Sequence, residues 1–247
     1  MQLDIGFHTD PGPRKGENQD SLLVETSESE PGATLLVVAD GMGGAQAGEQ
    51  ASREAVSVIR RELMGNLPAP SVAGERLHKA IDSANTSIFS RAQSARELEG
   101  MGCTVVAVLI LDDAYWIASV GDSRVYLVRE GEVVQLTDDH TWVNARVREG
   151  VLTPEQAANH SLRHVLDRAL GTRPSVEVDI RPDEFLEEGD ILVLCTDGLY
   201  GVLDDQTIAG VASRSGAQEA AEELVAKALD AETHDNVSVV VLHVAEL

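Results

Sequence analysis

The chain has 247 residues, of which 43% are hydrophobic and 25% are charged, and its formal net charge is -23. This is the composition of a globular protein with enough residues for a sizeable core. The acidic excess argues against nucleic acid as a partner, because phosphate backbones require a basic surface, and two cysteines exclude a disulfide framework.

The first half of the chain predicts strands followed by a helix pair. Strands are expected at residues 3–9, 21–25 and 35–40, the last being five apolar residues followed at once by Asp40. Residues 48–64 and 73–95 then carry apolar side chains at every third or fourth position, which predicts two amphipathic helices. Ser71 is placed to cap the second helix. The short connection between them favours an antiparallel pair laid on a sheet.

The second half returns to strands. Residues 103–111, 114–120, 123–129 and 132–136 are separated by short turns and predict an antiparallel meander. Residues 137–171 switch to short helical pieces, one of them with a capping box at Thr153. Two further strands (175–180 and 191–195), a helix (217–229) and a closing strand (236–244) follow. The pattern predicts one α+β domain over residues 1–247.

Five aspartates stand at the ends of predicted strands: Asp20, Asp40, Asp122, Asp197 and Asp235. For Asp40-Gly41 or Asp197-Gly198 taken alone, a hairpin turn remains the alternative. Taken together, five carboxylates at one rim would repel one another strongly unless cations were bound there. Oxygen ligands without a His or Cys cluster suit Mg²⁺ or Mn²⁺, and two such ions can activate water and clamp a phosphoryl group.

Seven motifs in this chain resemble those of the type 2C, metal-dependent serine/threonine protein phosphatases (PPM family). They are RKGENQD (14–20), VADGMGGAQAGEQAS (38–52), MGCT (101–104), VGDSRVY (120–126), LTDDH (136–140), CTDGL (195–199) and HDNV (234–237). They follow the family's order and cover nearly the whole chain. The sequence is most similar to the compact bacterial members, which carry no extra domain.

The resemblance implies a four-layer α-β-β-α sandwich, in which two central antiparallel sheets are flanked by antiparallel helix pairs and residues 137–171 form a variable flap. It also implies a two-metal centre of Mn²⁺ or Mg²⁺ ions. Asp40 would bridge the two ions and Gly41 would bind one of them through its carbonyl oxygen. Asp197 and Asp235 would bind the other ion, and Asp20 would hold metal-bound waters. Asp122, with Asp197, would contribute to a third, weaker metal.

The activity implied is hydrolysis of phosphoserine and phosphothreonine in proteins by a metal-bridging hydroxide, without a phosphoenzyme intermediate. The family usually has an arginine five residues before the first aspartate. Here Lys15 stands there, and Arg14 is one place earlier. Lys15 is the expected phosphate contact and Arg14 the alternative, although lysine offers a point charge rather than a bidentate fork. Either could instead be a solvated loop cation.

The histidines leave one role open. A histidine is suited to protonate the leaving oxygen near pH 7, and His160 and His164 lie in the flap, but the sequence does not choose between them. His140 is expected to make a structural hydrogen bond at the sheet edge.

The alternative to an enzyme is a non-catalytic metal-binding module that recognises phosphoproteins. The presence of all five aspartates favours the enzyme. The expected partners are phosphorylated proteins and a cognate bacterial serine/threonine kinase or its substrates, with no membrane contact. No targeting segment or transmembrane stretch is found in the sequence, so we expect a cytoplasmic protein, monomeric by default.

Overall fold

Two antiparallel sheets lie face to face in the computed structural model. The structure describes residues 1–13, 17–30 and 32–246, apart from the side chains of Ala45 and Asp183. One sheet has the strand order β1 (Gln2–Asp10), β11 (Val237–Glu246), β10 (Ile191–Cys195), β7 (Arg124–Arg129) and β8 (Glu132–Gln135). The other has the order β2 (Asp20–Thr26), β3 (Ala33–Met42), β5 (Val105–Leu111), β6 (Ala114–Val120) and β9 (Asp179–Phe185). The short strand β4 (Gly102–Cys103) pairs with the end of β3.

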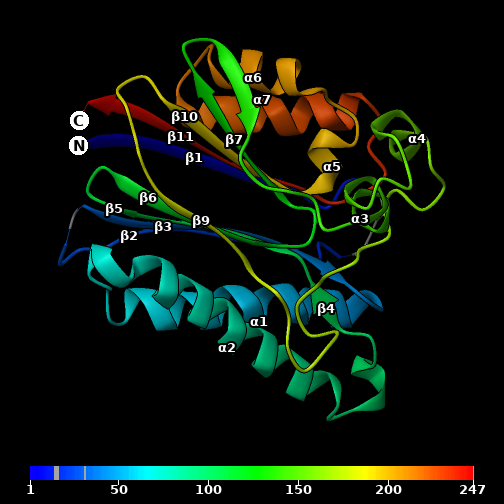
Figure 1. Ribbon diagram of the computed structural model, residues 1–247. Helices are drawn as coiled ribbons and strands as arrows, with labels where there is room; N and C mark the ends of the chain where they lie inside the picture. The colour runs from blue at the N-terminus through cyan, green and yellow to red at the C-terminus, as the bar shows by residue number, and fades with distance from the viewer. Residues whose placement is uncertain (14–16, 31, 247) are drawn as a thin grey trace.

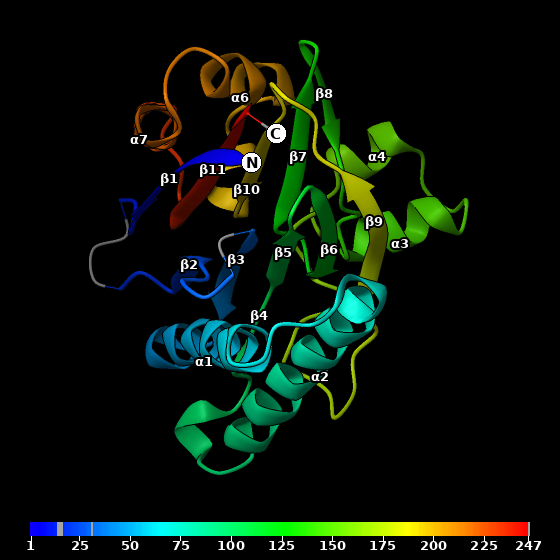
Figure 2. The ribbon, with the colours of Figure 1, turned by 90° about the vertical axis from the view of Figure 1, so that its left-hand side faces the viewer.

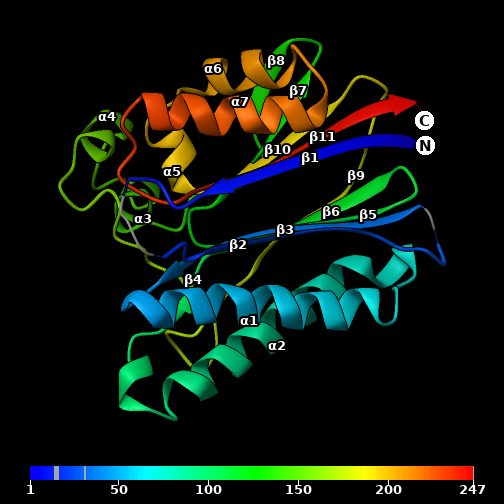
Figure 3. The same ribbon diagram turned by 180° about the vertical axis from the view of Figure 1, so that it is seen from behind.

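Helices cover the outer face of each sheet (Figures 1 and 3). The β2–β9 sheet carries α1 (Ala45–Met64) and α2 (Ala73–Ala92), while the other sheet carries α6 (Asp205–Ala212) and α7 (Ala217–Asp230). At one end of the sandwich lie α3 (Trp142–Arg148), α4 (Pro154–Ala158) and α5 (Asp197–Tyr200). The predicted α-β-β-α sandwich is confirmed. None of the described helices is long and apolar enough to cross a membrane.

Alternating side chains of the central strands divide between different cores. On β3, Leu36 and Val38 join the cluster between the two sheets, whereas Leu35 and Val37 join the cluster beneath α1 and α2. The strand is therefore buried on both faces, as its unbroken apolar run predicts. Because side chains on a strand alternate with period two, Asp40 continues the inner row and lies on the face between the sheets.

Several local predictions about the elements are wrong. Ser71 does not cap α2, because a 3-10 turn over Pro70–Val72 precedes the helix and its N-cap is Val72. The strand expected at 175–180 lies at Asp179–Phe185, where polar residues of an edge strand hide the alternating pattern. Helix α6 was not predicted, although the side chain of Asp204 caps it by accepting from the Thr207 N–H at 2.7 Å. The capping box at Thr153 is confirmed.

The predicted meander is also wrong, and this error matters for the site. Strands β5 and β6 pair in one sheet and β7 and β8 pair in the other, so residues 121–123 carry the chain from one sheet to the other. Gly121 adopts φ +102 there, and a Cβ on it would lie 2.6 Å from the side chain of Thr104. Asp122 thus sits on a crossover between the sheets rather than in a hairpin.

Replacing Gly41 by alanine is expected to lower the free energy of unfolding by about 2–3 kcal/mol. A Cβ at this position would lie 2.2 Å from the backbone oxygen of Gly48 and 2.5 Å from that of Gln19, so β3 would have to move away from α1. The matched control is Gly44→Ala, where a Cβ meets open space, with an expected loss below about 1 kcal/mol. Urea denaturation measures both, and equal losses would contradict the close-approach argument.

Candidate metal centre

All five predicted aspartates come from segments that meet at the end of the sandwich carrying α3, α4 and α5 (Figure 1). Asp20 and Asp40 are directly opposite each other in the β2–β3 register, so both lie on the face between the sheets. Asp197 is the first residue of α5, immediately after β10 and Thr196, and Asp235 lies in the loop before β11. Like charges directly opposite on neighbouring strands are destabilising, which marks this rim as a place where charge must be compensated.

The two Asp-Gly pairs differ in local structure, and neither is a hairpin turn. Strand β3 continues through Asp40 and Gly41 to Met42, where it pairs with β4. Asp197 instead opens a helix, and a Cβ on Gly198 would lie 2.0 Å from the backbone oxygen of Asn236. In both places the glycine allows another backbone segment to approach closely.

Burial and mutual repulsion raise the pKa values of four of these carboxyl groups and so make them hard to ionise. Burial raises the pKa of Asp20 to about 7, with further contributions from the charges of Asp197 and Asp235. Burial also raises the pKa of Asp40 well above its usual range, and four neighbouring aspartates add to the shift, Asp20 first. Burial and then Asp197 raise the pKa of Asp122 to about 7, while burial and then Asp235 raise that of Asp197 to about 6. The five groups therefore form one electrostatic cluster.

Neighbouring polar residues fix the carboxylates and their backbones in place. The Thr196 hydroxyl donates to Asp20 Oδ2 at 3.0 Å. Thr104 accepts from the Asp40 N–H through its hydroxyl at 3.1 Å and donates its own N–H to the Asp40 carbonyl at 2.8 Å. Asn236 accepts from the Gln19 N–H at 2.9 Å, which ties the start of β2 to the loop that carries Asp235.

These supporting residues were missed in the sequence. Thr196 and Asn236 each stand beside an aspartate inside a motif quoted above, and that adjacency was the available signal, whereas Thr104 closes the MGCT motif, which contains no aspartate.

The donor set fits hard divalent cations. In the described part of the chain, Asp20 Oδ1 and Asp197 Oδ1 are buried oxygen atoms without a hydrogen-bond partner, and buried polar atoms are rarely left unpaired. Carboxylate oxygens are the ligands that Mg²⁺ and Mn²⁺ prefer. Among the described residues, no three His, Cys, Asp or Glu side chains already form a group that could hold a metal ion. A closer approach of these like charges would require a cation between them.

A cavity of about 630 Å³ opens beside Asp122, between the flap and strands β7 and β8. Its lining includes His164 and Arg163 from the flap. Burial lowers the pKa of His164, and the charge of Arg163 adds to this, while Asp235 is close enough to oppose it. His160 instead packs its ring against Trp142, with the ring centroids 5.1 Å apart. Of the two flap histidines weighed as general acids, His164 is the one that lines this cavity.

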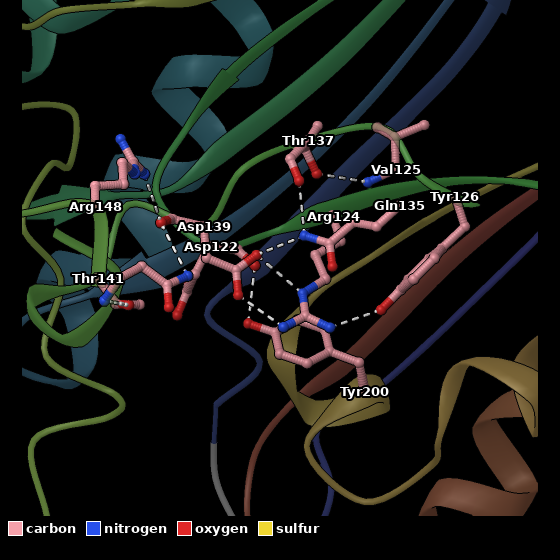
Figure 4. A network of polar contacts seen from close by, with 11 residues as sticks. Asp122, Arg124, Val125, Tyr126, Gln135, Thr137, Asp139, Thr141, Arg148 and Tyr200 are labelled. Carbon is pink, nitrogen blue, oxygen red and sulfur yellow. Dashed lines mark hydrogen bonds and ion pairs between the residues drawn. The ribbon is translucent and has the colours of Figure 1, made fainter. Parts of the chain in front are cut away.

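Arg124 also lines this cavity, and Figure 4 shows its polar contacts. Its guanidinium forms two hydrogen bonds with Asp139, at 2.9 and 2.7 Å, and lies 3.6 Å over the centre of the Tyr200 ring. The Tyr200 hydroxyl donates to the Asp122 carbonyl at 2.8 Å. The predicted phosphate contacts Arg14 and Lys15 lie outside the described residues.

Comparison with known proteins identifies the family. Residues 14–236 match protein phosphatase 2C. The serine/threonine phosphatase stp of Listeria welshimeri is 35% identical over 241 residues, which cover 96% of this chain and 94% of that protein. The serine/threonine protein phosphatase PstP of Mycobacterium tuberculosis is 36% identical over 246 residues, and the chain spans 46% of its length. A crystal structure of the catalytic domain of PstP with two manganese ions matches with a TM-score of 0.84 at 32% identity, over 99% of each chain. The chain therefore belongs to the protein phosphatase 2C family of serine/threonine protein phosphatases, as its motifs predict.

Proposed function

We propose that this chain hydrolyses phosphoserine and phosphothreonine esters in proteins at the rim formed by its five clustered aspartates. The observation that carries the proposal is the pair of buried carboxylate oxygens without partners, on Asp20 and Asp197, two carboxyl groups whose pKa values are raised by burial and by neighbouring aspartates. Such a cluster is poorly suited to a metal-free protein and well suited to binding divalent cations. The family match and the manganese-bound relative point to the same chemistry.

Each aspartate has a proposed role in holding the ions or their water. Asp40 would bridge two Mn²⁺ or Mg²⁺ ions, and the Gly41 carbonyl would bind one of them. Asp197 and Asp235 would bind the other ion, and Asp122, with Asp197, would contribute to a third. When bound, the ions supply positive charge and an activated water for direct attack on phosphorus, without a phosphoenzyme intermediate. Asp20, held by Thr196, would orient water at the site.

The phosphate and the rest of the substrate would be held by different parts of the chain. Lys15, with Arg14 as the alternative, would offset the negative charge of the phosphate dianion. The residues that flank the phosphorylated side chain would enter the cavity beside Asp122, because Asp122 is both part of its lining and one of the proposed ligands. His164 lines this cavity, and we propose it as the proton donor to the leaving serine or threonine oxygen.

The physiological role follows from the reaction class. A phosphoserine and phosphothreonine phosphatase opposes a serine/threonine kinase, so we propose that a cognate kinase or its substrates supply the phosphoproteins. We further propose that residues 1–247 act as one catalytic unit, as a monomer in the cytoplasm.

The purified protein is expected to release phosphate from a phosphothreonine peptide and from p-nitrophenyl phosphate in the presence of Mn²⁺. A chelator should remove the activity and added Mn²⁺ should restore it, because the carboxylates bind no substrate by themselves. Asp197→Asn should lower kcat on the order of 10²-fold or more. Metal-dependent binding of the phosphopeptide without phosphate release would contradict the proposal and support a non-catalytic recognition module.

A further inference from the structure

His140 is a buried residue that bonds twice to the peptide preceding Asp122. Its ring atom Nδ1 accepts from the Gly121 N–H at 3.1 Å, and its own backbone N–H donates to the Gly121 carbonyl at 2.8 Å. Both backbone groups of Gly121 are thus satisfied by this one residue. Since Asp122 is the next residue, His140 restricts the orientation of its backbone.

The same residue lies at the base of the flap, where residues 141–166 leave and rejoin the rest of the fold. The His140 carbonyl accepts from the Asp167 N–H at 2.8 Å. Beside it, Thr141 and Leu166 form an isolated antiparallel bridge, and the Trp142 N–H donates to the Val165 carbonyl at 2.7 Å. These bonds close the flap where it leaves and rejoins the fold. His140 is therefore bonded both to the flap base and to the turn that carries Asp122.

The second ring nitrogen holds the imidazole in one orientation. His140 Nε2 lies 3.1 Å from Asp179 Oδ2, and Arg168 bonds the other oxygen of Asp179 at 2.7 Å. With Nδ1 accepting from Gly121, the ring must carry its proton on Nε2 and donate it to Asp179. Burial lowers the pKa of His140, and the charges of Arg168 and Arg148 add to this while Asp179 opposes it. The neutral ring that this geometry requires is thus favoured.

The backbone of Asp122 also accepts a hydrogen bond of its own, which restricts it further. The Tyr200 hydroxyl donates to the Asp122 carbonyl, and Arg124 covers the Tyr200 ring (Figure 4). Asp139, next to His140 in the chain, accepts from Arg124 through its side chain. Its backbone carbonyl accepts from Asn144 and Arg148 of the flap helix α3, at 3.3 and 3.2 Å. The flap and the Asp122 turn are therefore linked by two routes, both through neighbouring residues of the LTDDH motif.

We propose that His140 is a positioning residue, which sets the orientation of Asp122 through the Gly121 N–H and couples it to the base of the flap. The inference rests on the proposed function, in which Asp122 binds the third metal. In this proposal the affinity of the Asp122 site for its metal depends on His140, which is not itself a metal ligand. Residues that orient a metal ligand through hydrogen bonds strongly affect metal affinity. A substrate that fills the cavity and moves the flap would change that affinity.

Two variants separate the bonds of the ring. In His140→Asn, the amide oxygen takes the place of Nδ1 and can still accept from Gly121, but the contact with Asp179 is lost. In His140→Gln, the longer amide reaches towards Asp179, but no acceptor remains for Gly121. The half-exposed residue His78, which pairs with Asp82 on α2, supplies the control variant His78→Gln. Asp122→Asn reports on the proposed ligand itself.

Calorimetric titration with Mn²⁺ measures the weakest site of each variant. His140→Gln should weaken it about 10- to 100-fold, whereas His140→Asn should change it less than about 3-fold and His78→Gln not at all. If Asp122→Asn loses this site while His140→Gln keeps it, the positioning role is overturned and the ligand assignment stands. If Asp122→Asn binds Mn²⁺ like the unmodified chain, the positioning role of His140 and the assignment of Asp122 as a ligand both fail. Release of phosphate from a phosphopeptide would then still support the wider proposed function. Equal losses in the two His140 variants would reduce His140 to a structural role.

Hydrogen exchange on the unmodified protein tests the coupling without relying on a variant that folds. If His140 links the two regions, Mn²⁺ should slow exchange of the Gly121 and Asp167 amides together, because both are bonded to His140. Slowing at Gly121 with no change at Asp167 would overturn the coupling to the flap.

Discussion

Asp40→Asn is expected to abolish phosphatase activity while it stabilises the metal-free protein. Activity should fall on the order of 10³-fold, because the proposed bridge between the ions loses its charge. The metal-free protein should gain about 1–3 kcal/mol of stability, because the variant removes a carboxylate that lies opposite Asp20 in the strand register and is repelled by the other clustered aspartates. A side chain that destabilises the fold and is needed for activity is the mark of a binding site.

Initial rates with saturating Mn²⁺ and thermal unfolding in chelator measure the two effects of Asp40→Asn. Asp230→Asn is the matched control, since Asp230 is exposed at the last position of α7, and neither quantity should change appreciably. A variant that kept its activity would contradict the role of Asp40. One that lost stability in chelator would contradict the repulsion argument.

The metal-free protein is expected to lose stability as the pH rises from about 4 to about 7. The folded-state pKa values of Asp20 and Asp122 are raised from 3.8 to about 7, and that of Asp197 to about 6. Between these values the unfolded chain releases protons that the folded chain retains, so each carboxyl group opposes folding increasingly as the pH rises. Above about pH 7 the loss is complete, because the folded chain has by then released these protons as well.

Melting temperatures in chelator at pH 5 and pH 8 test this pH dependence. The value at pH 8 should be lower by about 5–10 °C, and Mn²⁺ should remove the difference, because bound cations favour the ionised carboxylates. Asp122→Asn should flatten the profile, which separates the cluster from other titrating groups. A melting temperature that rises with pH in chelator would show that the carboxylates do not repel one another in the folded state.

The strands and long helices could be predicted because their patterns are local. The apolar run before Asp40 indicates a strand buried on both faces, and alternation then places Asp40 between the sheets. The five strand-end aspartates were also visible in the sequence. Their grouping followed from the expectation that strand ends share a rim, and the structure brings the elements that carry them together.

The connections could not be predicted because they depend on contacts between distant residues. A short turn such as residues 121–123 looks the same in sequence whether the strands on either side pair or belong to different sheets. The direct opposition of Asp20 and Asp40 is a matter of register between β2 and β3. The hydrogen bond from the Gly121 N–H to His140 Nδ1 joins residues 19 positions apart, and no local sequence pattern in either segment predicts it.

The position of β11 in its sheet has a consequence for how the protein is made. This strand follows all the others in sequence but lies between β1 and β10 and pairs with both (Figure 2). The sheet therefore stays open along an unpaired edge until residues 237–246 have left the ribosome, while the sheet with α1 and α2 can form earlier. Contacts over such sequence separations form slowly. Asp20 and Asp235 meet only at this last step, so the nascent chain acquires its acidic centre once synthesis has passed β11.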